Sequence, residues 1–195
     1  MRKQRIRDYY AELKRSMDGI IGTDGNGAAF ACDEAIERLV TLVTDQAAAG
    51  GKLYFIGNGA SASIASHQAV DFWKGTGIPS LCFNDAALLT CISNDYGYPS
   101  VFEKPVELFL GPQDVLVAIS SSGESENILR AVSAARRKGS KVLTLSGFKE
   151  SNRLRKLGDL NLYVPATDYG PIEVTHHSIL HCALDTLMRQ RHPRT

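Results

Sequence analysis

The stretch LYFIGNGASASIASHQAVDFWKG (residues 53–75) decides the fold class of this chain. Residues 53–57 are apolar without alternation, which is typical of a strand that is covered on both faces of a sheet. A glycine turn with small hydroxyl residues follows, and residues 60–74 then have a helical pattern. A buried strand that runs through a glycine turn into a helix predicts a unit of a parallel α/β fold.

Four further apolar runs repeat this pattern, and helical patterns lie between them. The sequence ENILRAVSAARRKG (126–139) predicts a helix that ends at Lys-Gly, and Pro105 predicts a helix that begins or kinks there. Two more helices, at about 3–18 and 29–49, are predicted before the first strand. The alternation predicts a doubly wound α/β sandwich with a five-stranded parallel sheet, whose other strands are SLCFN (80–84), VLVAIS (115–120), KVLTLS (141–146) and LYVP (162–165).

Length and composition describe an ordinary globular chain. The 195 residues fit a single domain over 1–195, in which 1–50 supply helices for packing between subunits and 51–190 form the sandwich. The 22 Lys and Arg residues nearly balance the 21 Asp and Glu residues, so nucleic acid and membrane are not expected as partners. Four scattered cysteines without a CxxC pair predict free thiols and a cytoplasmic location.

Loops that follow the predicted strands are the expected ligand-binding segments, because ligands of open α/β sheets bind outside the carboxyl ends of the strands. The segment SSSGESEN (120–127) places four serines around Gly123 at a junction of strand and helix. Serine hydroxyls and the free N–H groups of a helix start together favour a phosphate, whereas the alternative is that one serine only caps the helix. GNGAS (57–61), with Asn58 and Ser61, is a second turn of this type. Neither turn matches a Walker A or GxGxxG motif, so a nucleoside triphosphate is not expected.

Titratable side chains gather on two predicted helices. His67 and Asp71 are four residues apart and therefore share a helix face. The C-terminal sequence PIEVTHHSILHCALDTLM has the same spacing on one face, at Glu173, His177 and His181. Such a set suits general acid–base catalysis or a metal ion if the two helices meet. The alternative is that these histidines are merely hydrogen-bonded or solvated.

These motifs together resemble the sugar isomerase (SIS) domain of the phosphoheptose isomerase family. The resemblance rests on GNGAS with the His and Asp that follow it, on SNDYG (93–97), on SSSGESEN and on the late helix with IE…H…H, and it extends from about Lys52 to Leu187. It implies a flavodoxin-like fold with two extra N-terminal helices. It also implies a homotetramer with sites between subunits, which interconverts sedoheptulose 7-phosphate and glycero-manno-heptose 7-phosphate.

The resemblance further implies roles for individual residues. Asp71 corresponds to the catalytic base of the family, and His181 corresponds to its catalytic acid. The zinc that some members bind would be held by His67, Asp71, Glu173 and His181, and iron or manganese would suit this set as well. The residues implied to bind the substrate are Asn58, Gly59, Ser61, Asp95, Ser120, Ser121, Ser122, Ser125 and Glu173, with residues 120–125 around the phosphate.

Three positions depart from the family pattern. Asp71 replaces a glutamate, Glu173 replaces a glutamine, and an arginine beyond the base is absent, with only Lys74 nearby. The two acidic changes predict a more anionic metal site, in which His177 is a spare ligand, and His176 is expected to reach a neighbouring subunit. Two other functions stay open: an isomerase for another ketose phosphate, and a non-catalytic SIS adaptor that binds the bacterial replication initiator. An adaptor has no need of the acid–base set.

Overall fold

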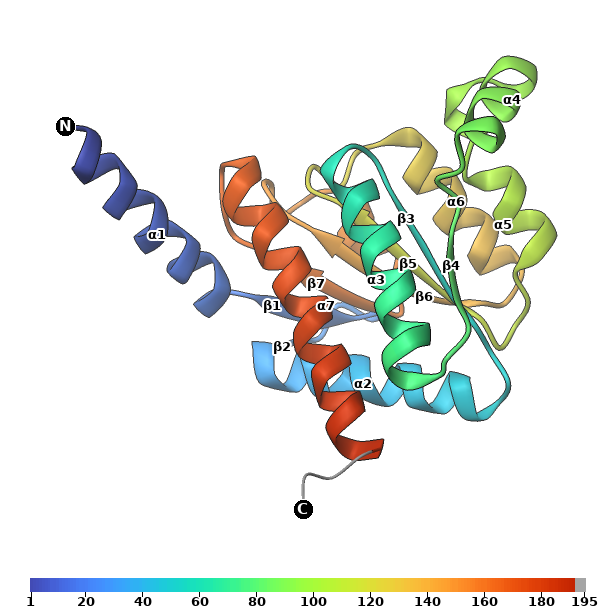
Figure 1. The fold of residues 1–195 in the computed structure, drawn as a ribbon, viewed down its shortest axis with the longest axis horizontal. Helices are drawn as coiled ribbons and strands as arrows, with labels where there is room; N and C mark the ends of the chain where they lie inside the picture. Colours follow the sequence, from blue (N-terminus) through green and yellow to red (C-terminus); the bar gives the residue numbers. More distant parts are fainter. Residues whose placement is uncertain (192–195) are drawn as a thin grey trace.

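Parallel strands form the centre of the molecule, as the apolar runs predict. The computed structural model describes residues 1–191, and its strands join in one sheet of the order β2-β1-β7-β6-β5-β3-β4 (Figure 1). The doubly wound α/β class and the five predicted parallel strands are confirmed. The bounds of these strands are β3 Leu53–Gly57, β4 Ser80–Cys82, β5 Val115–Ser120, β6 Lys141–Ser146 and β7 Leu160–Tyr163.

The strand order creates a switch point between β3 and β5. Strand β3 pairs with β4 on one side and with β5 on the other, and the sheet continues from β5 through β6 to β7. The last residue of β3, Gly57, lies opposite Ile119 of β5. Ligands of open α/β sheets bind outside such a switch point. Two segments leave the strands here, namely the GNG turn (residues 57–59) and the serine loop (residues 120–125).

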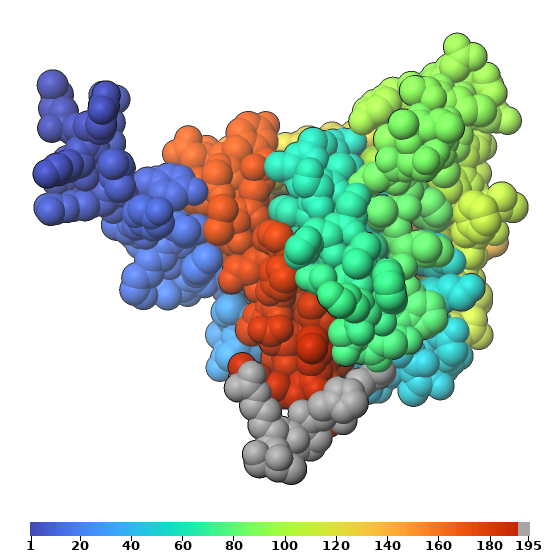
Figure 2. Space-filling model, viewed as in Figure 1, coloured from blue at the N-terminus to red at the C-terminus, as the bar shows by residue number. Residues whose placement is uncertain are grey.

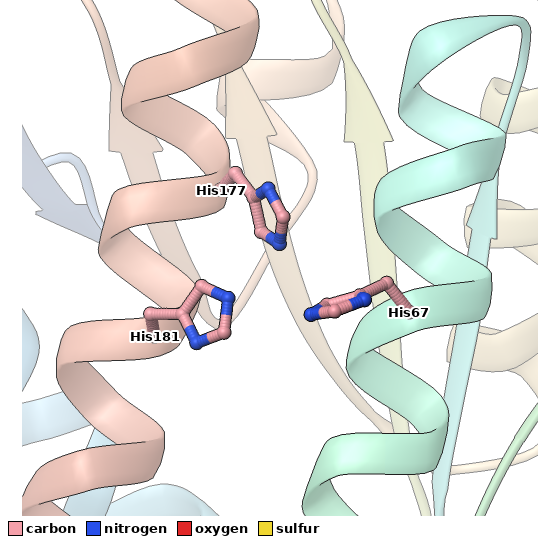
Figure 3. A group of neighbouring side chains, drawn as sticks. All are labelled: His67, His177 and His181. Carbon is pink, nitrogen blue, oxygen red and sulfur yellow. The ribbon is translucent and has the colours of Figure 1, made fainter.

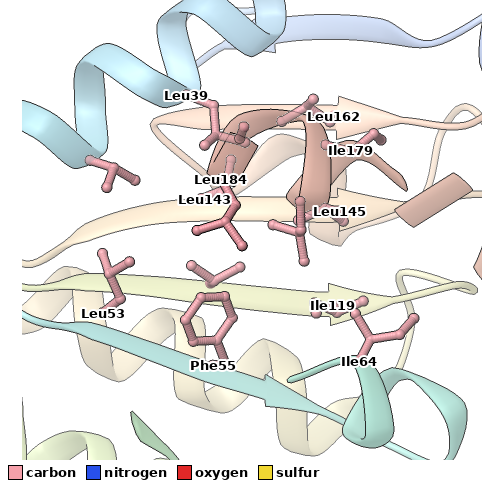
Figure 4. Close-up of a cluster of buried hydrophobic side chains, with 14 of the residues drawn as sticks. Leu39, Leu53, Phe55, Ile64, Ile119, Leu143, Leu145, Leu162, Ile179 and Leu184 are labelled. Carbon is pink, nitrogen blue, oxygen red and sulfur yellow. The ribbon is translucent and has the colours of Figure 1, made fainter. Parts of the chain in front are cut away.

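Helices cover both faces of the sheet because its strands are apolar on both faces. In β3, Phe55 belongs to the core beneath α2, α3 and α7, whereas Ile56 belongs to the core beneath α5 and α6. Figure 4 shows the first of these two cores, with side chains from α2, α3 and α7 packed on the strands. The bounds of the helices are α2 Cys32–Ala48, α3 Ala60–Thr76, α4 Ala86–Tyr96, α5 Glu103–Phe109, α6 Glu126–Arg137 and α7 Tyr169–Arg191, with single 3₁₀ turns at Tyr98–Ser100 and Leu154–Lys156.

A β-hairpin lies between the first two helices, so the prediction that only helices precede the first strand is wrong. Strands β1 (Ile21–Asp24) and β2 (Ala29–Phe30) are antiparallel to each other, and β1 is antiparallel to β7. The Asp24 carboxylate closes the turn, because it accepts hydrogen bonds from the N–H groups of Asn26 and Ala28, both 2.9 Å long. The sheet therefore has seven strands instead of five, and α2 begins later than predicted.

Helix α1 (Arg2–Asp18) stands away from the body of the molecule (Figures 1 and 2). It contacts α7, and Ser16 is its one buried residue. Most of the surface of this helix is therefore exposed in the single chain. Within residues 1–191, no helix is both long enough and apolar enough to cross a membrane.

Candidate active site

Hydrogen bonds within the serine loop fix its shape. The Gly123 N–H donates to the carbonyl oxygen of Ser120 at 3.0 Å, and the Ser120 Oγ lies 3.2 Å from the same nitrogen. Ser120 and Ser121 are buried, whereas Ser122 and Ser125 are half-buried. The four predicted serines therefore belong to one ordered turn at the carboxyl end of β5.

Ser125 precedes the first residue of α6, but its side chain does not cap this helix. The Ser125 Oγ lies 3.5 Å from the Ser120 Oγ, and the amide oxygen of Asn127 accepts the hydrogen bond of the Ile128 N–H at 3.0 Å. An ordinary capping serine would use its hydroxyl as the acceptor for the helix N–H groups. Ser125 is therefore able to donate its hydroxyl to an anion at the positive end of the α6 dipole.

Asn152 packs against the serine loop and leaves no room for a side chain at Gly123. Asn152 is buried, and its Nδ2 donates hydrogen bonds to the Ser146 Oγ at 3.2 Å and to the Lys149 carbonyl oxygen at 2.8 Å. Gly123 has a φ of 64°, and a Cβ atom at this position would clash with the Asn152 side chain. Both the backbone conformation and the available space therefore require glycine here.

The GNG turn is tied to the helix that follows the serine loop. The side-chain amides of Asn58 and Asn127 exchange two hydrogen bonds of 2.9 Å each. The Tyr98 hydroxyl donates a third hydrogen bond, of 3.0 Å, to the Asn58 Oδ1. The turn lines a pocket of about 270 Å³ together with residues of α3, Asn84 and Tyr98. The two predicted ligand-binding turns are therefore parts of one connected edge of the sheet.

Three histidines meet where α3 packs against α7 (Figure 3). The ring centroid of His67 lies 4.9 Å from that of His177 and 5.4 Å from that of His181. The centroids of His177 and His181 are 4.6 Å apart. One nitrogen of each ring lies within 4.8 Å of a nitrogen of each of the other two, which no other group of three His, Cys, Asp or Glu side chains in residues 1–191 achieves. We call these three residues the histidine cluster.

Asp71 lies at the edge of the histidine cluster, one helical turn beyond His67. Its Oδ2 is 2.9 Å from the His67 Nε2, and the Asp71 side chain is 28% exposed. Neither Asp71 nor Glu173 belongs to the group of ligand atoms that lie within 4.8 Å of one another. Of the four predicted metal ligands, the structure thus brings together His67, Asp71 and His181 and leaves Glu173 apart.

The surroundings of His177 favour its neutral form. Burial lowers the pKa of this imidazole, and the neighbouring rings of His181 and His67 lower it further. The His177 Nε2 is buried and has no hydrogen-bond partner among the described residues. A neutral imidazole with an unpaired nitrogen is the form that binds a metal ion.

His176 does not reach a neighbouring subunit, so that prediction is wrong. Its side chain is fully buried within its own chain, and its Nε2 lies 3.1 Å from the carbonyl oxygen of Ser146. Burial lowers the pKa of His176 to about 4. Because Ser146 pairs with Ser120, His176 connects α7 to the strand beside the serine loop.

Two predicted substrate ligands belong to helices and not to the serine loop. Asp95 is exposed on α4 and accepts a hydrogen bond of 2.9 Å from the Asn94 side chain, whereas Ser61 is buried in the first turn of α3. Among the described residues, the histidine cluster and the serine loop also share no hydrogen bond, ion pair or ring contact. A single chain therefore presents the predicted phosphate-binding and proton-transfer groups as two neighbouring but separate sets.

Three residues that shape the site are absent from the sequence predictions, namely Tyr98, Asn127 and Asn152. Asn127 lies within the motif SSSGESEN, and Tyr98 directly follows SNDYG. The position of each residue in or beside a motif could therefore have indicated that it belongs to the site. The partner of Asn127 is 69 residues away, however, and becomes visible only when β3 and β5 are adjacent. No local pattern distinguishes Asn152 from an ordinary loop asparagine.

Comparison with known proteins gives a consistent result. The family model of the SIS domain matches residues 9–147. The chain is similar to the phosphoheptose isomerase of Proteus mirabilis (strain HI4320), with 36% identity over 163 residues, which cover 80% of this chain and 84% of the relative.

Solved structures agree with this similarity. The phosphoheptose isomerase of Neisseria gonorrhoeae superposes with a TM-score of 0.83 and 28% identity, over 96% of this chain and 98% of that protein. A phosphoheptose isomerase from Francisella tularensis superposes with a TM-score of 0.84 and 27% identity, over 97% of this chain and 99% of that protein. The likeness extends over nearly the whole of each chain.

Proposed function

Because this chain belongs to the SIS domain family and, within it, to the phosphoheptose isomerases, a family of phosphosugar isomerases, we propose that it interconverts sedoheptulose 7-phosphate and glycero-manno-heptose 7-phosphate. The observation that carries this proposal is the packing of α3 against α7. This contact gathers Asp71, His67 and His181 in one place, as an acid–base catalyst requires and a mere adaptor does not.

The serine loop holds the phosphate of the substrate in this proposal. Two observations support this role. The loop lies at the switch point of the sheet, and the hydroxyl of Ser125 at the start of α6 does not cap the helix. Neutral hydroxyl donors and the helix dipole bind the dianion without a permanent positive charge. Asn58, held by Asn127 and Tyr98, positions the GNG turn beside the sugar.

Asp71 and His181 move protons in the reaction. Isomerisation shifts a carbonyl group between C1 and C2, so a proton must leave one carbon and arrive at the other. The Asp71 carboxylate takes this proton and returns it through an enediol, while the His181 imidazole transfers the proton between the two oxygens. His67, 2.9 Å from Asp71, orients the carboxylate.

A zinc ion is part of the proposal, because imidazole nitrogens are common zinc ligands and three of them face one another here. The family resemblance places zinc on His67, Asp71, Glu173 and His181, and of these the two imidazoles lie in the histidine cluster. When bound, the ion would polarise the sugar oxygens and stabilise the negative charge of the enediolate.

Assembly into a homotetramer completes the proposal. Large apolar side chains are exposed on α1, α3, α4 and α5, and aromatic residues are enriched in contacts between proteins; examples are Tyr10, Trp73, Tyr96 and Leu108. Residues 1–50 would supply part of the contact, since α1 buries so little within its own chain. All four cysteines are free thiols, which supports a reducing, cytoplasmic location.

The test is isomerisation of sedoheptulose 7-phosphate by the purified protein in D₂O, followed by NMR. We expect turnover with deuterium incorporated at C2 of the aldose, because the enediol exchanges its proton with solvent through Asp71. Unphosphorylated sedoheptulose should react at least ~10²-fold more slowly, because the binding energy of the phosphate is then missing. If the protein converts another ketose phosphate but not sedoheptulose 7-phosphate, the proposed substrate is wrong and the reaction class stands. If the protein converts no ketose phosphate and binds the replication initiator tightly, the proposed isomerase activity is wrong and the adaptor function is supported.

A further inference from the structure

His177 gives the histidine cluster a third imidazole that the family-derived ligand set does not include. Figure 3 shows the rings of His177 and His181 on α7 turned toward the ring of His67 on α3. All three rings belong to one chain, and one nitrogen of each lies within 4.8 Å of the others. The carboxylates of Asp71 and Glu173 stand outside this group.

The unpaired nitrogen of His177 is the second observation. Its Nε2 is buried without a hydrogen-bond partner among the described residues, although the rings of His67 and His181 lie beside it. A buried polar atom without a partner is unfavourable by about 1–3 kcal/mol, so native structures usually satisfy it. Neither neighbouring ring satisfies it by a hydrogen bond, whereas a shared cation would satisfy all three rings at once.

We propose that His67, His177 and His181 of a single chain bind one zinc ion, with His177 in the place that the family resemblance gives to a side chain at position 173. The fourth coordination position then stays open to an oxygen of the substrate, as in other catalytic zinc sites with three protein ligands. Asp71 is not needed as a ligand and keeps its carboxylate for proton transfer. The catalytic use of the ion rests on the proposed function, but the binding of the ion does not.

Geometry and charge both agree with three imidazoles. Zinc–nitrogen bonds of about 2.0–2.1 Å place the nitrogens of a tetrahedral site about 3.4 Å apart, so small side-chain rotations must bring the rings closer. His67 is half exposed, so its ring has room to rotate, although the rotation competes with the 2.9 Å contact between its Nε2 and Asp71. Three neutral ligands leave the full charge of the ion beside an anionic sugar phosphate, whereas the two carboxylates of the other set would cancel it.

Zinc binding to the purified, chelator-treated full-length protein without a histidine tag tests the proposal. Calorimetry should give one zinc ion per chain, and X-ray absorption of the zinc-loaded protein should count three imidazole ligands. His177→Gln should weaken zinc binding by at least ~10²-fold, because removal of a ligand exceeds the 10–100-fold effect of the groups around it. Glu173→Gln should leave the affinity unchanged. Cys182→Ser is the matched control, because this exposed thiol is next to His181 on the same helix and also binds zinc in other settings.

The outcomes separate this proposal from the proposed function. Circular dichroism and thermal unfolding of each zinc-free variant show whether a loss of affinity reflects a loss of fold. Loss of zinc binding in Glu173→Gln with normal binding in His177→Gln would overturn the three-histidine site, and so would wild-type protein that binds no zinc. Isomerase activity in such a zinc-free protein would still leave the proposed reaction intact.

Discussion

The serine loop and the histidine cluster differ in how their polar atoms are satisfied. In the serine loop and the GNG turn, the chain supplies its own partners: Gly123 bonds to Ser120, and Asn58 exchanges two hydrogen bonds with Asn127. In the histidine cluster, the Nε2 of His177 has no partner among the described residues, and His67 is joined only to Asp71 by a polar contact. The hydrogen bonds named in the first region are therefore formed within the chain, whereas the second region has a buried nitrogen without a partner among the described residues.

This difference shows which part of the site the fold prepares in advance. A preorganised loop loses less conformational entropy when it binds a ligand, so the proposed phosphate-binding loop needs little rearrangement. The histidine cluster gathers groups that lower the pKa of His177 and do not satisfy its buried nitrogen. The polar atoms of the histidine cluster are therefore not all satisfied by the described residues of the chain itself.

The largest expected effect is on the turnover rate and concerns Asp71, beside the histidine cluster. Asp71→Asn keeps the size of the side chain and removes the base, so kcat for sedoheptulose 7-phosphate should fall ~10²- to 10⁴-fold with little change in KM. Steady-state kinetics measures both constants. Asp185→Asn, an exposed acidic residue on α7, is the control and should retain wild-type activity. Near-normal kcat in Asp71→Asn would assign the base to another group.

A smaller effect is expected at His176, which precedes His177 on α7 and contacts Ser146 at the end of β6. The folded-state pKa of His176, about 4, is below the value of 6.5 that the free side chain has. The unfolded state therefore binds more protons, and stability falls as the pH drops from 6.5 toward 4. Between pH 7 and pH 5 this residue alone should reduce the free energy of unfolding by about 2 kcal/mol.

Urea unfolding of the zinc-free protein at the two pH values measures this loss, and the His176→Gln variant supplies the reference. The variant is expected to be less stable at pH 7 but to lose about 2 kcal/mol less than the wild type on acidification. An equal loss in both proteins would show that His176 is not the titrating group.

The smallest expected effect is on stability and concerns Gly123 in the serine loop. Gly123→Ala forces a side chain into the Asn152 contact at a positive φ, so it should lower the free energy of unfolding and raise KM for the phosphorylated substrate more than it changes kcat. Gly77→Ala is the matched control, because Gly77 also has a positive φ but a Cβ atom added there would meet no other atom within 4 Å. We expect Gly123→Ala to be the less stable of the two by about 1–2 kcal/mol.

Thermal or urea unfolding of the two variants measures this difference, and substrate kinetics shows whether KM follows it. Equal destabilisation by the two substitutions would mean that backbone strain alone accounts for the effect. The Asn152 support of the serine loop would then have no energetic importance.

Local sequence patterns were sufficient for much of the fold. Continuous apolar runs predict the five parallel strands, and the helical pattern after 53–57 predicts α3, because burial on both faces and the 3.6-residue period are properties of short segments. The hairpin at 21–30 was not predicted, although Asp24-Gly25 and Asn26-Gly27 are strong turn signals. Its strands are short, and β1 is held by pairing with β7, which is more than 130 residues away.

The sequence by itself also determined which side chains are candidates for the chemistry of the site. The serines around Gly123, the spacing of His67 and Asp71, and the late histidines are all visible in the printed chain. Only the tertiary structure decided how they group, because contacts between side chains on different elements depend on which strands and helices become neighbours. The pairing of β3 with β5 joins Asn58 to Asn127, and the packing of α3 on α7 adds His177 to the cluster and leaves Glu173 outside it. The same packing turns His176, one residue away, into the core, because successive residues of a helix point about 100° apart.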